Sequence, residues 1–273
     1  MQISLFGSTG NETLERQGEP PSLCESTSPM TRIGVIADVH ANRPALDAVL
    51  KSLKRFRVDR LLCCGDLVGC GPWPEETIDR LREEEILCVR GNHDDAVLHF
   101  ARYRSRGNET NFRMLSWTHD RLSPDQRRYL AKLPDRHTER EIVVVHGGLR
   151  SPLLEFVVDP QTARENFPLL DRSIGLVGHS HLQGGFVRSG SIVSTLPAVE
   201  HPVPLNPRCQ YLINPGSVGM PRDGDPRAAY AILDQDRRTL TYARASYDAE
   251  SVRRRMQALG FDKLCSPERG EGL

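Results

Sequence analysis

Five short apolar runs of the sequence each end in a polar group drawn from Asp, His and Asn. These groups are Asp38-Val39-His40, Gly65-Asp66, Gly91-Asn92-His93-Asp94, His146-Gly147 and Gly178-His179-Ser180-His181. In open α/β sheets, ligands bind beyond the carboxyl ends of the strands. Glycine, present in four of the five groups, permits a close approach of the backbone. The pattern therefore predicts one polar site assembled from five strand ends.

The first third of the chain alternates between strand and helix patterns. Strands are expected at residues 32–37, 60–64 and 86–89, with helices at 44–56 and 74–84 between them. Strands separated by helices of this length are typical of parallel βαβ units. A mostly helical insert is expected at residues 95–133.

The second half of the chain is richer in strands. They are expected at residues 141–145, 173–177, 185–188, 191–195, 210–213, 228–233 and 239–244, before a helix at 248–259. Because Gly-containing turns join several of them, we expect an antiparallel or mixed sheet. Two sheets packed face to face, with helices outside, accommodate both halves of the chain in an α/β (α+β) fold.

The two ends differ from the middle of the chain. Residues 1–29 are rich in Ser, Thr, Glu, Gly and Pro without periodicity, which predicts a disordered tail. Met30 stands directly before the first strand, so it stays open whether the upstream residues belong to the mature protein. We expect the folded domain at 30–262 and a flexible tail at 263–273.

Charge and composition limit the classes of partner and the cellular location that we expect for this chain. Lys+Arg and Asp+Glu are equal at 36 each, which argues against a long nucleic-acid partner. No stretch approaches the ~18 apolar residues of a membrane span, and the start lacks the features of a secretory signal. The seven cysteines form no C-x-x-C pattern. Reduced thiols and a cytoplasmic location are therefore expected.

The order of the five polar groups resembles that of the calcineurin-like metallophosphoesterase superfamily, over almost the whole chain after Met30. The stretches GDLVGCGP (65–72), VRGNHD (89–94) and NPGSVGMPRDGDPRAAY (214–230) resemble its small bacterial YfcE-related branch. The resemblance implies a four-layer αββα sandwich of two mixed sheets, flanked by helices. It also implies a metallophosphoesterase domain that hydrolyses phosphomonoesters, phosphodiesters or both.

The resemblance also implies the metal ligands. Asp38, His40 and His181 would complete one site, Asn92, His146 and His179 the other, and Asp66 would bridge them. Imidazole nitrogen and carboxylate oxygen suit two divalent ions of Mn, Fe, Zn, Ni or Co, with Mn²⁺ as the first expectation. Ions ~3.5–4 Å apart bind a phosphoryl group together with the hydroxide between them, which attacks phosphorus.

The resemblance further implies that His93 is not a ligand but the general acid that protonates the leaving oxygen. Many phosphodiesterases of the YfcE-related branch have Cys at this place. His at this position favours a broader capacity that includes poor leaving groups such as alkoxides. Arg43 and Arg90 lie near two of the motifs. They are candidates for contact with phosphate oxygens, and a surface role is an equal alternative for each.

Two further segments are expected near the site. The insert at 95–133 would overhang it, with Tyr103 or Trp117 stacking on an organic leaving group or, alternatively, only packing against the sandwich. The NPGS segment at 214–217 would return towards the metals, with its Asn and Gly serving as turn residues.

Other functions remain open at this point. One is a phosphatase for phosphoproteins or for dinucleoside polyphosphates of the Ap4A type. Another is a non-catalytic metal-binding interaction scaffold, although filled ligand positions and His93 argue against lost catalysis. The expected partner is a small phosphate ester, with nucleotides included, and neither a membrane nor a long nucleic acid. A homo-oligomer also stays open.

Overall fold

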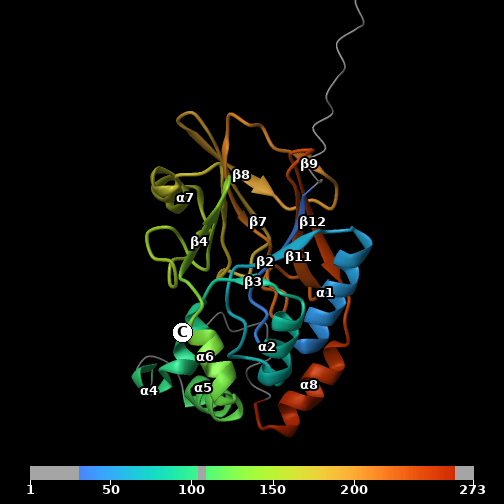
Figure 1. The fold of residues 1–273 in the computed structure, drawn as a ribbon. Coiled ribbons are helices and arrows are strands. Elements are labelled where there is room, and N and C mark those ends of the chain that lie inside the picture. Colours follow the sequence, from blue (N-terminus) through green and yellow to red (C-terminus); the bar gives the residue numbers. More distant parts are fainter. Residues whose placement is uncertain (1–30, 104–108, 262–273) are drawn as a thin grey trace, which may run out of the picture.

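The computed structural model describes residues 31–103 and 109–261, and within them two six-stranded sheets lie face to face (Figure 1). The tails expected at 1–29 and 263–273 lie outside the described residues. The chain forms the first sheet from both of its ends and the second sheet mostly from its middle.

The first sheet has the strand order β3-β2-β1-β11-β12-β9. Its parallel strands are β1 (Arg32–Ile36), β2 (Arg60–Cys63) and β3 (Leu87–Cys88). Its antiparallel strands are β11 (Ala228–Asp234), β12 (Thr239–Ala245) and β9 (Val203–Pro204). The helices α1 (Arg43–Arg55) and α2 (Pro74–Glu83) connect the parallel strands, as the sequence predicts.

The second sheet has the order β4-β5-β6-β10-β7-β8 and is also mixed. Its parallel strands are β5 (Ile142–Val145), β6 (Ile174–Leu176) and β10 (Gln210–Asn214). The strands β4 (Arg136–Glu139), β7 (Gly184–Ser189) and β8 (Ile192–Pro197) pair antiparallel with their neighbours. The predicted mixed sheet is confirmed.

Three apolar layers separate the four layers of structure. Side chains from both sheets, such as Val35, Leu62, Val144 and Ile213, are completely buried between them. On the outer face of the first sheet lie α1 and α2, with α8 (Ala249–Ala258) beside α1 (Figure 1). The outer face of the second sheet is covered by α7 (Pro160–Asn166) and the 3₁₀ turn Phe167–Leu169. The fold is the predicted αββα sandwich.

The sequence of α1 explains how the outer helices dock. Leu46, Val49, Leu50 and Leu53 recur at helical spacing and are buried on one stripe. Asn42, the residue before the helix, accepts a hydrogen bond from the Ala45 backbone N–H and so caps the helix. The helix thereby begins directly after the polar group 38–40 and fixes the place where that group lies.

The insert is helical, as expected. It contains the last part of α3 (Asn92–Leu98), which begins before the insert, and then α4 (Phe100–Tyr103), α5 (Glu109–Arg121) and α6 (Pro124–Ala131). Trp117 packs edge-on against Phe261, with ring centroids 5.8 Å apart, in a small cluster with Met114 and Met256. This contact supports the packing role of Trp117, while the side chain of Tyr103 lies outside the described part.

Two further findings concern the whole described chain. No disulfide joins the cysteines of the described ranges. None of the helices in these ranges combines the length and the apolar character that a membrane crossing requires.

Candidate metal centre

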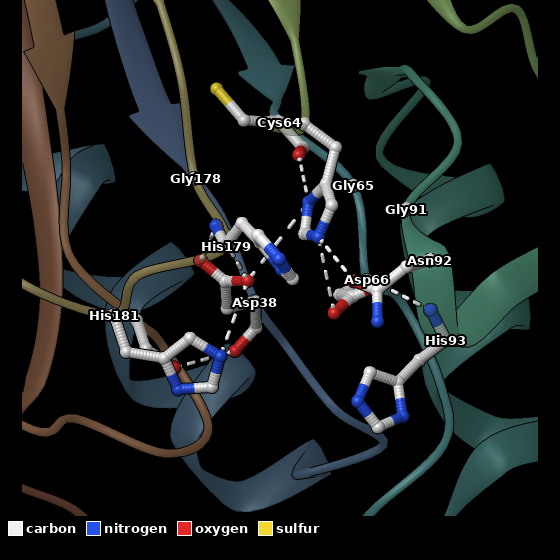
Figure 2. Close-up of polar contacts among 12 residues, drawn as sticks. Asp38, Cys64, Gly65, Asp66, Gly91, Asn92, His93, Gly178, His179 and His181 are labelled. Carbon is white, nitrogen blue, oxygen red and sulfur yellow. Dashed lines mark hydrogen bonds and ion pairs between the residues drawn. The ribbon is translucent and has the colours of Figure 1, made fainter. Parts of the chain in front are cut away.

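The carboxyl ends of the parallel strands of both sheets meet at one edge of the sandwich. β1, β2 and β3 bring Asp38 with His40, Asp66 and Asn92 from the first sheet. From the second sheet, β5 brings His146 and β6 brings His179 with His181. In Figure 2, the labelled side chains of Asp38, Asp66, Asn92, His179 and His181 converge on one place. The structure thus brings together all seven residues that the sequence and the resemblance single out as ligands.

The potential ligand atoms fall into two overlapping groups. Asp38, His40, Asp66 and His181 form one, and Asp66, His146 and His179 form the other, with ligand atoms within 4.8 Å of one another in each. Asn92 joins the second group, because its Oδ1 lies 2.8 Å from His146 Nε2. Asp66 belongs to both groups, as a carboxylate that bridges two metal ions would.

The orientation of His181 exposes a lone pair to the site. Its Nδ1 lies 2.6 Å from the carbonyl oxygen of Met220, which can only accept, so Nδ1 carries the proton. Nε2 is then an acceptor. It faces the carboxylate oxygen Asp38 Oδ1 at 3.4 Å and His40 Nε2 at 3.1 Å. Two acceptors at this distance repel each other unless a cation lies between them.

His146 repeats this arrangement in the second group. Its Nδ1 lies 2.8 Å from the Cys64 carbonyl oxygen, and its Nε2 faces Asp66 Oδ2 at 3.3 Å. Asp66 Oδ2 is buried without a hydrogen-bond partner among the described residues. Burial lowers the pKa of His146, but the negative charge of Asp66 outweighs it and raises the pKa to about 9. A positive charge is therefore favoured at this place, and a divalent metal ion fits it.

Asp66 stays ionised although it is completely buried. Burial by itself raises its pKa, but the neighbouring charges of His146 and His93 bring the pKa well below its usual value. A β-carbon at Gly91 would lie 2.0 Å from Asp66 Oδ1, so glycine is required there. An ionised, closely enclosed carboxylate is suited to hold two cations at once.

Five of the seven candidate ligands have positive φ angles: 54° at Asp38, 48° at His40, 54° at Asp66, 65° at His179 and 60° at His181. Residues other than glycine adopt this left-handed region rarely, at a cost of roughly 1–3 kcal/mol each. Such strain is typical of functional sites and turns the side chains away from the strand direction into the site.

His93 lies beside both groups. Its backbone N–H donates to Asp66 Oδ1 at 2.8 Å, and its ring meets the His40 ring edge-on with centroids 4.8 Å apart. Its Nδ1 is 3.7 Å from Cys70 Sγ, so His40, Cys70 and His93 form a third group of potential ligands. A β-carbon at Gly69 would meet the His93 ring at 2.6 Å, which shows how closely the loop encloses this ring.

Asp94 connects the two loops of the first sheet. Its carboxylate accepts hydrogen bonds from the backbone N–H groups of Leu67 and Gly91, both at 2.9 Å, and of Val68 at 3.2 Å. Burial raises the pKa of Asp94 to about 7. Its role is to hold the loops that carry Asp66 and Asn92 at a fixed distance.

The NPGS segment returns to the site, as predicted. Ser217 Oγ donates to the Asp38 carbonyl oxygen at 2.8 Å, and Asn214 Nδ2 donates to the Gly178 carbonyl oxygen at 2.8 Å. Gly216 has a φ of 78°, a conformation that suits glycine in a turn. These residues support the ligand loops and offer no ligand atom to the two groups.

The two arginines singled out in the sequence are bonded to neighbouring acceptors. Arg43 Nε donates to Asp47 Oδ2 at 2.7 Å, and its Nη1 donates to the Glu76 carbonyl oxygen. Arg90 donates to Asp135 Oδ1 through Nε at 2.9 Å and Nη2 at 2.6 Å. Each guanidinium group is therefore engaged within the protein.

Arg222 is a cation beside the site that the sequence reasoning missed. Its backbone N–H donates to the His181 carbonyl oxygen at 3.3 Å. Burial is the main reason that the pKa of His179 falls to about 3, and the charges of His146 and Arg222 lower it further. No ion pair joins Arg222 to a carboxylate within the described ranges, whereas Arg244 and Arg227 engage the acids of the same loop.

Phe156 is the second residue that was missed. Its ring stacks on His179, with centroids 4.0 Å apart and an angle of 23° between the planes. Neither Phe156 nor Arg222 follows a predicted strand, so no local motif marks them. The sequence does contain one signal for Arg222, because it lies in the run 214–230 that carries part of the resemblance.

Comparison with known proteins agrees with this geometry. The family model of the calcineurin-like phosphoesterase superfamily domain matches residues 31–238. An uncharacterised protein of Methanocaldococcus jannaschii is 31% identical over 230 residues, covering 81% of this chain and 89% of its own length. Phosphodiesterase YfcE of Escherichia coli is 26% identical over 222 residues, covering 76% and 89%. The crystal structure of a metallophosphoesterase from Sphaerobacter thermophilus matches with a TM-score of 0.76 at 34% identity, covering 87% and 98%.

Proposed function

The chain belongs to the calcineurin-like phosphoesterase superfamily and is a metal-dependent phosphoester hydrolase, and we propose that it works with two metal ions bridged by Asp66. The observation that carries this proposal is the set of buried acceptor atoms that face one another at short range. His181 Nε2 lies 3.4 Å from Asp38 Oδ1, and His146 Nε2 lies 3.3 Å from Asp66 Oδ2. Two cations would turn both repulsions into attractions.

The donor set suits a first-row transition metal. Asp38, His40 and His181 would hold one ion, and Asn92, His146 and His179 the other. Mn²⁺ is the proposed native metal, with Fe, Zn, Ni and Co as alternatives. When bound, the pair supplies Lewis acidity to the phosphoryl oxygens and a water whose pKa is lowered towards neutrality.

The residues of the chain then divide the work. Asp66 would hold the two ions together, and its Oδ1 accepts a hydrogen bond from the His93 backbone N–H, which places His93 next to the candidate ligands. His93 donates a proton to the leaving oxygen as the general acid. Cys70, at 3.7 Å from His93 Nδ1, is the polar side chain that faces this nitrogen.

Arg222 supplies positive charge for the anionic substrate. After burial as the main cause, its charge is one of those that lower the pKa values of His40 and His181. The backbone hydrogen bond to the His181 carbonyl oxygen holds Arg222 next to a candidate ligand, from where its guanidinium group would contact a phosphoryl group bound at the site. Guanidinium groups bind phosphate oxygens strongly, because they donate parallel hydrogen bonds.

The proposed substrates are small phosphodiesters and phosphomonoesters. A histidine in the place of the acid protonates a leaving alkoxide, which both ester classes release. The relative YfcE is named a phosphodiesterase, and this supports diester hydrolysis here.

Two measurements test the proposal. Metal analysis of the purified protein should find about two ions per chain. With Mn²⁺ added, the protein should hydrolyse both p-nitrophenyl phosphate and bis-p-nitrophenyl phosphate. His93→Ala should retain its metal and lose about 10²–10⁴-fold in kcat on both esters. Full turnover in His93→Ala would show that another group is the acid, and a protein that hydrolyses neither ester would refute the function.

A further inference from the structure

An exposed aromatic ring lies directly on one of the candidate metal ligands. Phe156 stacks on His179, yet 41% of its surface remains exposed to solvent. Single exposed aromatic residues are common on protein surfaces and need no explanation by themselves. A ring that covers a ligand of the reactive centre is different, because any group attached to a phosphoryl group bound there comes within its reach.

The backbone around Phe156 is fixed on both sides. The preceding Glu155 points inwards, where its carboxylate accepts a hydrogen bond from Asn166 Nδ2 at 3.0 Å and pairs with Arg150. The following Val157 is buried in the apolar layer beneath α7, with Ala163. Because both neighbours are anchored, the ring is held in place before a ligand arrives, which reduces the entropy lost on binding.

Exposure alternates along this segment. Leu154, Phe156 and Val158 are 52%, 41% and 47% exposed, while Glu155 and Val157 between them face the protein. The segment therefore presents apolar side chains at the edge of a site whose other residues are His, Asp and Asn. An apolar surface here has no use for binding phosphate, but it suits the organic part of an ester.

We propose that Phe156 determines specificity by stacking on a planar aromatic ring in the organic group of the substrate, as in aryl or nucleoside esters. The proposal rests on the proposed phosphoesterase function. An aromatic face favours another flat ring over a flexible alkyl chain or a strongly hydrated group such as a sugar. Because stacking involves the π-face of a ring and not the polar groups on its edge, several different rings would bind.

Binding of two non-hydrolysable ligands isolates this contribution. Phenylphosphonate and methylphosphonate carry the same phosphoryl group and differ in the ring. Their dissociation constants are measured by titration calorimetry on the Mn²⁺-loaded protein. The ratio of the two constants cancels any change in how the metal centre binds the phosphoryl group itself.

The variants are Phe156→Ala, Phe156→Leu, Phe156→Trp and the control Phe56→Ala. Phe56 has the same exposed fraction, 41%, but lies at the carboxyl end of α1, away from the metal ligands. The preference for phenylphosphonate should fall about fivefold to tenfold in the Ala and Leu variants. It should persist in Phe156→Trp and in Phe56→Ala.

The metal content of every variant is also measured. It distinguishes the proposed stacking on the substrate from the alternative that the Phe156 ring only shields His179. In that case Phe156→Ala would lose metal and bind both phosphonates more weakly by the same factor, which would overturn the proposal. An unchanged ratio in Phe156→Ala and Phe156→Leu would overturn it as well. If the wild-type protein bound neither phosphonate and cleaved neither nitrophenyl ester, the proposed function itself would be refuted.

Discussion

At the scale of single residues, the chemistry of the site depends on which ring nitrogen of each histidine faces inwards. Backbone carbonyl oxygens of Cys64 and Met220 take the Nδ1–H of His146 and His181. Both Nε2 atoms are thereby directed at carboxylates. Such outer hydrogen bonds usually orient metal-binding histidines and strengthen their ligation. The protein prepares the site for cations through its backbone, before a metal binds.

Arg222 allows a test of charge at the same scale. Arg222→Gln should weaken inhibition by inorganic phosphate about tenfold, because a charge-assisted hydrogen bond to the anion is lost. Arg227→Gln is the matched control, since Arg227 lies in the same loop but pairs with Asp225 and Glu200. The inhibition constant of phosphate, measured against p-nitrophenyl phosphate, decides the matter. If phosphate inhibition weakened equally in both variants, Arg222 would have no specific role in binding the anion.

The residues of the site differ in how far they can be predicted. The candidate ligands follow strands directly, so a short window of sequence contains both the strand and the ligand. Phe156 and Arg222 reach the site only because the long loops after β5 and β10 return to it. That these two residues lie beside the candidate ligands is a property of the folded chain, and no short stretch of sequence around them predicts it by its periodicity.

At the scale of elements, an ion pair joins the two sheets at the amino ends of the parallel strands β2 and β5, opposite the candidate metal centre. Arg60 of β2 and Glu139 of β4 are bonded through both oxygens of the carboxylate, with Arg60 Nη1 2.8 Å from Glu139 Oε2. The hydrogen bond from Arg60 holds the pKa of Glu139 below its usual value. The pair connects an edge strand of the second sheet to the first sheet.

Glu139→Gln should therefore destabilise the protein by about 1 kcal/mol at neutral pH. The folded-state pKa of Glu139 lies below the unfolded value, so this stabilisation is present above that value and is lost as the pH falls through the folded pKa. Denaturant unfolding of wild type and variant should differ at pH 7 and converge at acidic pH. Glu83→Gln, whose partner Arg80 lies in the same helix, is the control. A difference that does not depend on pH would contradict the assignment to this charge.

Elements with a clear period were predicted, and irregular ones were not. The buried runs of β1 and β5 and the apolar stripe of α1 gave strong signals. The strand β4, Arg-His-Thr-Glu, has no apolar residue and exists because it pairs with β5. The helix α7 was missed although Asp159 caps it and Pro160 begins it, a recognisable start signal. With only 7 residues, α7 is too short to show a clear helical period of apolar residues.

At the scale of the whole molecule, the candidate metal centre lies where the two sheets meet, and each sheet contributes candidate ligands to it. Binding of metal therefore links the sheets. It would also offset the repulsion between buried acceptors such as His181 Nε2 and Asp38 Oδ1. Metal binding and stability of the fold must be coupled for these reasons.

Adding Mn²⁺ to metal-depleted protein should raise the unfolding free energy, by about 2.7 kcal/mol at a hundred times the dissociation constant. The shift of the melting temperature with metal concentration measures this coupling. Mg²⁺ should shift it less, because four of the seven candidate ligands are histidines, His40, His146, His179 and His181, and imidazole suits the transition metals better. Asp66→Asn should abolish most of the shift, and a full shift in this variant would mean that Asp66 does not bridge.

The candidate ligands lie in the first few residues after the strands, whereas Phe156 lies in the later part of the connection between β5 and α7. Changes in that connection can alter what touches the substrate while the strands keep the reacting centre intact. A change of substrate would then require exchange of the segment around Phe156 only, with His146 at the start of the connection kept. In this architecture, the candidate ligands and the residue proposed to select the substrate lie in separate stretches of the sequence, so one can change while the other is kept.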